Sequence, residues 1–122
     1  MAWGDQVYLV VWQDHRTGYA DVYGARVDSE GNVLDPDGFP ICAGEWWAES
    51  PSVAWDDTNF LVVWSDDRDL ISHDVYGTRI NPDGAVLDGY GFRISSGSFR
   101  EIGPSVSFNG QNYLVAWEVE GG

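Results

Sequence analysis

Two adjacent tryptophans, Trp46 and Trp47, have the type and spacing of a binding surface. Neighbouring indole rings offer a flat apolar area, and the carboxylates of Glu45 and Glu49 flank them in the sequence. Rings beside polar groups can stack against a sugar or hold a protein segment. Trp46 has a second interpretation, which we favour, in which its ring wedges between two sheets as core. For Trp47 we favour the ligand-facing interpretation.

The same segment recurs 53 residues later with different side chains. Phe99 takes the position of Trp46, and Arg100 takes that of Trp47. An earlier loop adds Tyr19 and His15 as further candidates on the same expected face. Aromatic and polar side chains of this kind bind carbohydrate or protein. The predicted ligand-binding residues are therefore His15, Tyr19, Trp46, Trp47, Glu49, Phe99 and Arg100.

Aspartate–arginine pairs occur twice at one spacing, as Asp14 with Arg16 and as Asp66 with Arg68. A guanidinium can hold a charged ligand through a fork of two hydrogen bonds. Because the pairs recur with the scaffold, we favour structural salt bridges that fix each loop. The acidic run at residues 66–69 offers oxygen ligands that suit calcium, but it lacks the ordered spacing of a calcium loop. We expect a solvated acidic loop there, and no metal site.

Residues for catalysis do not form a recognisable motif. His15 and His73 are not at equivalent positions, and neither has a neighbouring Ser or Cys that suggests a nucleophile. These histidines can bind a metal only if an oligomer brings them together. Two carboxylates can meet as a glycoside-hydrolysing pair, yet no particular pair stands out. The lone Cys42 excludes an internal disulfide and a cysteine-based metal cluster. We expect no enzyme activity and no cofactor, with a glycoside hydrolase or lyase as the least favoured alternative.

Composition narrows the choice of partners. The chain of 122 residues carries 20 acidic residues and six arginines, without lysine, for a formal charge of -14. Phosphate backbones and anionic membranes require clustered cations, which excludes nucleic acid and membrane as partners. An apolar content of 43% with 15% aromatics indicates a folded chain. No apolar run reaches about 18 residues, and the N-terminal segment lacks the basic start and cleavage site of a signal peptide.

An internal repeat organises the whole chain. Trp12 recurs as Trp64 and Trp117, at steps of 52 and 53 residues, within the phrases VYLVVW, NFLVVW and NYLVAW. The phrases DVYG, VLD, GF and PSV also recur in register. The three tryptophans are expected to be core residues. Two units and the opening of a third follow, at residues 1–53, 54–106 and 107–122.

Each unit reads as four short antiparallel strands, which are SVAWD, NFLVVWSD, DVYGTRI and AVLDGYGFRIS in the second unit. Gly, Asn and Asp stand at the joints WDDTN and NPDG, as tight turns require. In residues 7–12 alternate side chains point to opposite faces, and both sets are apolar. This pattern predicts a strand in a sheet that is covered on both faces. No segment fits a helix.

Four-stranded sheets of about 50 residues that repeat face to face are the blades of a β-propeller. The segments PSVAWDDTNFLVVWSDDR and DVYGTRINPDGAVLD resemble the blade repeats of bacterial secreted and cell-surface propellers, in the broad company of kelch and sialidase (Asp-box) blades. The resemblance implies an all-β protein of about two blades plus the start of a third, located outside the cell or on its surface. The turns DSEGNVL and NPDGAVL lack the Ser/Thr start and closing Trp of an Asp-box, so sialidase chemistry is not implied.

Two blades cannot close a ring, since propellers use about four to eight. Exposed blade faces bury their aromatic rings by association, so we expect a ring of several chains, or a piece of a longer propeller. If SVAWD is the innermost strand, as the resemblance suggests, residues 1–53 lack most of an inner strand and the C-terminal PSVSFNG is a spare copy. One hypothesis is donation of that strand to another chain, where residues 112–117 would compete with residues 7–12. The other is a cut within a repeat.

The loops QDHRTGYAD, SDDRDLISHD, CAGEWWAES and SSGSFREIG are long and dissimilar, and in this strand order they share one face. Variable loops on a rigid scaffold commonly carry binding. The sequence thus predicts a noncatalytic, self-assembling β-propeller module that binds a carbohydrate or a protein through its loop-rich face. The alternative is a purely structural blade assembly, a fragment or an engineered object, that has no ligand.

Overall fold

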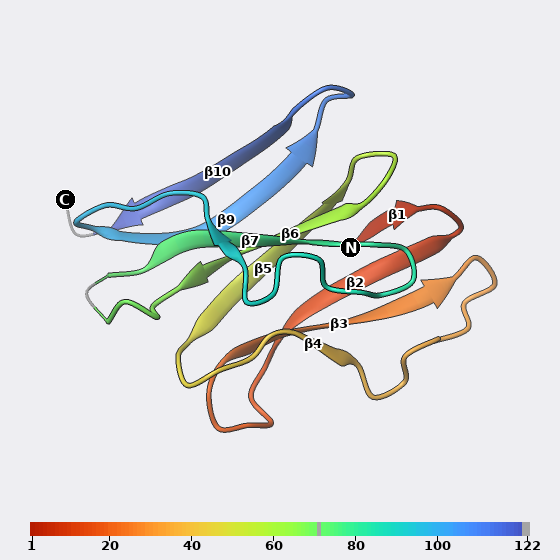
Figure 1. Cartoon of the computed structure of the whole chain (residues 1–122), viewed down its shortest axis with the longest axis horizontal. Coiled ribbons are helices and arrows are strands. Elements are labelled where there is room, and N and C mark those ends of the chain that lie inside the picture. Colours follow the sequence, from red (N-terminus) through yellow and green to blue (C-terminus); the bar gives the residue numbers. More distant parts are fainter. Residues whose placement is uncertain (71, 121–122) are drawn as a thin grey trace.

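The computed structural model describes residues 1–70 and 72–120, and these residues form β-strands and their connections, with no helix that could cross a membrane (Figure 1). The first sheet contains, in order, β1 (Ala2–Gly4), β2 (Val7–Asp14), β3 (Asp21–Asp28) and β4 (Phe39–Cys42). The second sheet contains β5 (Ala48–Trp55), β6 (Phe60–Asp66), β7 (Asp74–Ile80) and β8 (Phe92–Arg93). The third sheet pairs β9 (Arg100–Phe108) with β10 (Tyr113–Glu120). The predicted all-β fold with four-stranded antiparallel sheets is confirmed.

The three sheets lie in layers, with the second sheet between the other two (Figure 1). Strand β5 contacts β1, β2 and β3 of the first sheet, and β9 contacts β5, β6 and β7 from the other side. Each junction has its own apolar core. The core between the first and second sheets includes Leu9, Val22, Ile41, Phe60, Val62 and Trp64. The core between the second and third sheets includes Ala54, Leu61, Val63, Val75 and Val106.

Strand β6 shows why the second sheet needs a layer on each side. All seven of its residues are buried. Phe60, Val62 and Trp64 belong to the core shared with the first sheet, while Leu61 and Val63 belong to the core shared with the third. Successive side chains of a strand point to opposite faces, so apolar residues on both faces require two covering layers. The expected burial on both faces is confirmed for this strand.

Strand β2 has a layer on one side only. Leu9 and Val11 lie in the core shared with the second sheet, whereas Tyr8, Val10 and Trp12 are half-buried on the outer face of the first sheet. The prediction that residues 7–12 are covered on both faces is therefore wrong within a single chain. The apolar residues of the outer face remain in contact with solvent.

The three repeated tryptophans differ in exposure. Trp64 is fully buried and Trp12 is partly buried, but Trp117 is 36% exposed. The expectation of a core residue is therefore wrong for Trp117. Within the described residues no further strand pairs with the outer edge of β10, and the β9–β10 register shifts between Ala116 and Glu118. The third copy of the tryptophan thus lacks the surroundings of the second.

At one end of the sheets, tight turns occur where β5 joins β6 (residues 56–59) and at the start of the β7–β8 connection (residues 81–91), which is longer than any connection at the other end. Asp56 Oδ1 accepts hydrogen bonds from the backbone N–H groups of Thr58 and Asn59, at 2.9 and 2.7 Å. Asn81 Oδ1 accepts two backbone N–H groups in the same way. Asp and Asn stabilise turns by supplying such a side-chain acceptor. The predicted tight turns at both joints are confirmed.

The fourth strand is shorter than the sequence pattern indicates. β8 contains only Phe92 and Arg93, although the pattern predicts a strand over residues 85–95. Asp88 explains the difference, because its Oδ2 accepts the backbone N–H of Arg79 at 2.8 Å in place of a strand carbonyl. The same carboxylate binds the guanidinium of Arg79 through two further hydrogen bonds. A side chain therefore replaces part of the strand ladder.

Strand pairing sets the boundaries of the sheets. Residues 48–53 belong to β5, which pairs with β6 in the second sheet. Strand β1 has three residues where β5 has eight, so the first strand of the first sheet is short. The segment PSVSF lies in β9 and pairs with β10 of its own chain. In this structure the third unit therefore begins a sheet of its own.

Candidate functional site

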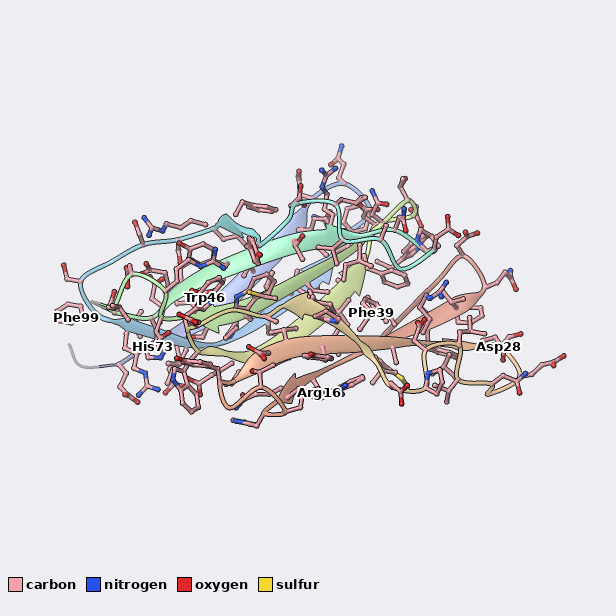
Figure 2. The ribbon with its side chains drawn as sticks, turned by 60° about the horizontal axis from the view of Figure 1, so that its bottom comes forward. Arg16, Asp28, Phe39, Trp46, His73 and Phe99 are labelled. Atoms are coloured by element: carbon pink, nitrogen blue, oxygen red, sulfur yellow. The ribbon has the colours of Figure 1, made fainter. Side chains whose placement is uncertain are left out.

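Four connections gather at one end of the layered sheets, here called the loop-rich end. Figure 2 shows Trp46, His73 and Phe99 toward this end and Asp28 at the opposite end. The predicted ligand-binding residues all lie in these connections or directly beside them. The connections are residues 15–20, 43–47, 67–73 (with residue 71 outside the described part) and 94–99.

Aspartate–arginine pairs anchor the connections that follow β2 and β6. The carboxylate of the buried Asp66 accepts a hydrogen bond from Trp64 Nε1 at 2.8 Å. It also accepts bonds from the backbone and guanidinium of Arg68 at 2.7 to 2.9 Å. Asp14 and Arg16 repeat this arrangement in the first unit, and the Arg16 guanidinium holds the pKa of Asp14 far below its usual range. Both carboxylates therefore serve as loop anchors.

Trp46 belongs to the Asp66 anchor and not to an open surface. Its Nε1 donates to Asp66 Oδ2 at 3.1 Å, and the guanidinium of Arg68 lies 4.6 Å from its ring centroid. The same guanidinium covers the ring of Tyr76 at 4.0 Å and donates to the carbonyl of Tyr90 at 2.7 Å. The indole N–H and one ring face of Trp46 are thus occupied. Trp46 takes the wedge position that the sequence offered as its second interpretation.

Trp47 has the opposite environment. It is 40% exposed, and Tyr19 beside it is 37% exposed. The Trp47 ring meets Tyr19 edge-on at 6.4 Å between centroids, and it meets His15 at 6.0 Å. We call His15, Tyr19 and Trp47 the aromatic cluster. The fold thus brings three of the predicted ligand-binding residues together on one exposed surface.

Backbone hydrogen bonds hold the aromatic cluster in place. The N–H of Trp47 donates to Asp67 Oδ1 at 2.7 Å, and the N–H of Asp67 donates back to the carbonyl of Trp47 at 3.1 Å. The N–H of Ala48 donates to the carbonyl of Ala20 at 2.8 Å, which ties β5 to the residue after Tyr19. The backbone that carries Trp47 is therefore tied to the connections that carry Asp67 and Tyr19 before a ligand arrives. Such preorganisation lowers the entropic cost of binding.

A small recess of mixed polar and apolar lining adjoins the aromatic cluster through Asp67. It has a volume of about 150 Å³ and is lined by Asp67, Leu70, Ser72 and His73. His73 Nε2 lies 3.5 Å from the carboxylate of Glu49, so a fourth predicted residue lies beside the recess. The recess gathers a carboxylate, a hydroxyl and an imidazole group, and Asp67 links it to the backbone of Trp47. Apolar area with a few convergent polar groups is the usual composition of a small-ligand site.

Phe99 lies apart from the aromatic cluster, on the side of the third sheet. It holds the repeat position of Trp46, which Arg68 and Tyr90 of the second unit cover. The third sheet ends with β10 in the described residues, so equivalents of these two side chains do not reach Phe99. Its ring consequently remains exposed.

Arg100 and Glu49 line a second cavity, of about 320 Å³, between the second and third sheets. Arg100 also pairs with Glu120 at 3.3 Å. Ser65 lines this cavity and holds the repeat position of Gln13. At the junction of the first and second sheets, Gln13 Oε1 accepts the backbone N–H of Ser50 in β5. The shorter serine side chain leaves the space open.

Metal ligands are not gathered in residues 1–70 and 72–120, where no group of three or more His, Cys, Asp or Glu side chains is arranged to hold an ion. Asp66 of the acidic run is buried against Arg68, so the expectation of a solvated loop is wrong for that residue. Cys42 is buried too, and burial raises the pKa of its thiol to about 12. A thiol that stays protonated at neutral pH is a poor nucleophile.

Two supporting residues were missed by sequence reasoning. Asp67 anchors the backbone of Trp47, and Gln13 Nε2 lies 3.1 Å from a ring nitrogen of His15. Asp67 has no signal beyond its membership of an acidic run, and Gln13 is not repeated. The Asp67 contact joins two connections that are 20 residues apart, whereas Gln13 lies only two residues from His15.

Comparison with known proteins adds no assignment. No protein-family model matches the chain, and no curated protein matches its sequence. The function proposed below therefore rests on the residues and geometry of the chain itself.

Proposed function

We propose that this chain is a noncatalytic β-propeller-type module that assembles with copies of itself and binds carbohydrate at the loop-rich end. The observation that carries the ligand site is the aromatic cluster, which is exposed and held by backbone hydrogen bonds. The face-to-face stacking of three antiparallel sheets supports the propeller architecture. A module of this type would work outside the cell or on its surface, as the resemblance to secreted propellers implies.

A sugar suits this surface because a sugar presents both an apolar face and polar hydroxyl groups. One face of a pyranose ring presents C–H groups that pack on an aromatic ring, and its hydroxyls require hydrogen bonds. Trp47 supplies an exposed ring, and the neighbouring recess supplies Asp67, Ser72 and His73. The site therefore matches the amphipathic character of a saccharide.

The acidic residues of the loop anchors favour binding over catalysis. Asp14 and Asp66 each accept several hydrogen bonds from an arginine two residues later. A carboxylate whose two oxygens are engaged by a guanidinium is not available to a substrate. The chemistry offered at the loop-rich end is therefore stacking and hydrogen bonding.

A glycan array, followed by titration calorimetry of the best binder, tests the proposal. We expect Trp47→Ala to weaken binding at least about tenfold, because the stacking surface is lost. Phe92→Ala is the control, since it removes an exposed ring of β8 that takes no part in the aromatic cluster, and affinity should not change.

Two results would contradict the carbohydrate site. In one, Trp47→Ala lowers thermal stability and leaves the affinity for a detected glycan unchanged, which would place that ligand elsewhere. In the other, the folded chain binds no glycan. A parallel protein array then separates a protein-binding module from the purely structural assembly, which has no ligand of either class.

A further inference from the structure

Within the chain, the first sheet packs on the second and the second packs on the third, so the same type of sheet-to-sheet interface forms twice. The outer faces of the first and third sheets carry the residues that form the two sides of this interface. We propose that a second copy of this chain docks head to tail, with the outer face of its first sheet on the outer face of the third sheet. The inference rests on the proposed self-assembly, for which it names the contacting faces, and it is independent of the carbohydrate site.

An aromatic pair marks the first side of the interface in every unit. Its members lie on the first two strands of each sheet, with tilted rings whose centroids are about the same distance apart. The pairs recur at steps of 52 and 53 residues, a signal present in the sequence. They are Trp3 with Tyr8 at 4.6 Å, Trp55 with Phe60 at 4.8 Å, and Phe108 with Tyr113 at 5.1 Å.

Two of these pairs are covered by the sheet that precedes them. The ring of Trp55 packs so closely on Gly4 of the first sheet that no Cβ could be accommodated there. The hydroxyl of Tyr113 reaches the second sheet and donates to the carbonyl of Asn59 at 3.4 Å. Each of these two pairs therefore packs near the turn between the first two strands of the preceding sheet.

The third pair, Trp3 with Tyr8, has no preceding sheet in the described residues, and Trp3 is exposed. The corresponding turn on the third sheet is residues 109–112, with Asn112 at the repeat position of Asn59. In the docked pair of chains, Tyr8 would donate to the carbonyl of Asn112 of the other copy. Val10 and Trp12 continue the same face along β2.

The second side of the interface is a leucine on the second strand of each sheet. Leu9 is fully buried under the second sheet, and Leu61 is buried under the third. Leu114 holds the same position in β10 but is exposed, while Tyr113 and Val115 on the opposite face pack against the second sheet. Leu114 is thus the one leucine of this repeated position that no layer covers.

A second copy is the occupant that both faces fit, because each chain carries one side of the interface at each end of its stack. Such a head-to-tail contact is heterologous, and it closes into a ring when the rotation permits. The formal charge of -14 on each chain opposes association, and salt screens that repulsion. Association should therefore strengthen as salt concentration rises.

Light scattering and native mass measurements over a range of concentrations test the docking. We expect a mass above the 13.5 kDa of one chain. Leu114→Glu or Val10→Glu alone should raise the dissociation constant at least about tenfold, because a charge would be buried without a partner. Leu70→Glu is the matched control, since Leu70 is exposed in a connection at the loop-rich end, and assembly should be unchanged.

A mixing experiment separates head-to-tail docking from other modes of association. The Leu114→Glu chain keeps the first-sheet face intact, and the Val10→Glu chain keeps the third-sheet face intact. An equimolar mixture should therefore form one-to-one dimers although neither variant assembles alone. If Val10→Glu fails to fold by circular dichroism, Trp3→Glu replaces it, because Trp3 is an exposed residue of the short strand β1.

The outcomes distinguish this inference from the proposed function. A wild-type chain that is monomeric at every concentration and salt level would refute both the self-assembly and the docking. An oligomer that survives both glutamate substitutions, or variants that do not pair when mixed, would refute the docking and leave self-assembly in place.

Discussion

Strands β6 and β10 carry nearly the same six residues in different surroundings. Residues 59–64 read NFLVVW, and residues 112–117 read NYLVAW. Leu61 is 6% exposed, whereas Leu114 is 68% exposed. The second sheet has a layer on each side, and the third sheet has a layer on one. Burial of a repeated strand therefore depends on how many layers cover its sheet.

Polar partners differ between the two strands as well. Trp64 donates its indole N–H to Asp66, which Arg68 also binds. The third unit has Val119 at the position of Asp66, so Trp117 has no carboxylate two residues after it. A buried indole N–H without an acceptor is unfavourable. The exposure of Trp117 is thus consistent with its own local sequence.

The largest difference in stability between β6 and β10 is expected when their tryptophans are replaced. Trp64→Ala should lower the free energy of unfolding by about 3–5 kcal/mol, because it empties a fully buried site. Trp117→Ala should lower it by less than about 1 kcal/mol. Urea unfolding in the Leu114→Glu background, which keeps chains apart, measures both. Equal losses of stability would show that β10 is as well packed as β6 and would contradict the claim that the number of covering layers sets the burial of the strand.

A second test compares the two loop anchors. Asp66→Asn should lower the free energy of unfolding by about 3 kcal/mol, because Arg68 keeps its charge among aromatic rings without a counter-charge. Asp14→Asn should have a smaller effect, since Arg16 is half-exposed and can turn to solvent. Chemical unfolding of both variants checks the order. The measurement uses the Leu114→Glu background, which keeps chains apart, and a larger loss for Asp14→Asn there would contradict the expected difference between the two anchors.

The smallest expected effect concerns acid. Guanidinium groups lower the pKa of Asp35 and of Asp88 below the ordinary value of 3.8. Each pair therefore stabilises the fold fully above that pH, and the contribution is lost as the pH falls through the folded-state pKa. We expect stability to decline below about pH 4.

The two carboxylates should not contribute equally to this acid sensitivity. Arg26, the partner of Asp35, also donates to the carbonyl of Pro82 in the second unit at 3.4 Å, and it is less exposed than Arg79. Asp35→Asn should therefore weaken the acid dependence of stability more than Asp88→Asn does. Each substitution should lower the free energy of unfolding at neutral pH by less than about 1 kcal/mol. Thermal unfolding from about pH 7 to about pH 2 measures both. A reversed order would mean that the Pro82 contact is absent in solution.

The candidate site was predictable residue by residue but not as an arrangement. Trp47, Tyr19 and His15 stand out in the sequence as loop residues. Their meeting depends on hydrogen bonds that join Trp47 to the connection after β6 and Ala48 to the connection after β2. The adjacent residues Trp46 and Trp47 lie in different environments. Trp46 contacts Asp66 and Arg68, which are about 20 residues away in the sequence, and residue spacing does not predict that contact.

Strand lengths were predictable only where the backbone makes all the hydrogen bonds. Alternation and turn residues placed β6 and β7 to within one residue, whereas the predicted strand SVAWD covers only the second half of β5, which begins at Ala48, inside the predicted first unit. The fourth strand was overestimated because the Asp88 side chain binds the backbone N–H of Arg79. A carboxylate can compete with a strand carbonyl for an N–H group, and a pattern of apolar residues does not register that competition.

By itself, the sequence determined the repeat period, the strand type and the turns, because these depend on local side-chain alternation and on turn residues such as Asp56 and Asn81. Only the tertiary structure decided which copies of the repeated strand are buried. Strands β2, β6 and β10 have nearly the same sequence. Layers cover both faces of β6 but only one face of β2 and of β10, so only β6 is buried on both sides. Apolar burial requires a neighbouring surface, and a neighbour is a property of the fold.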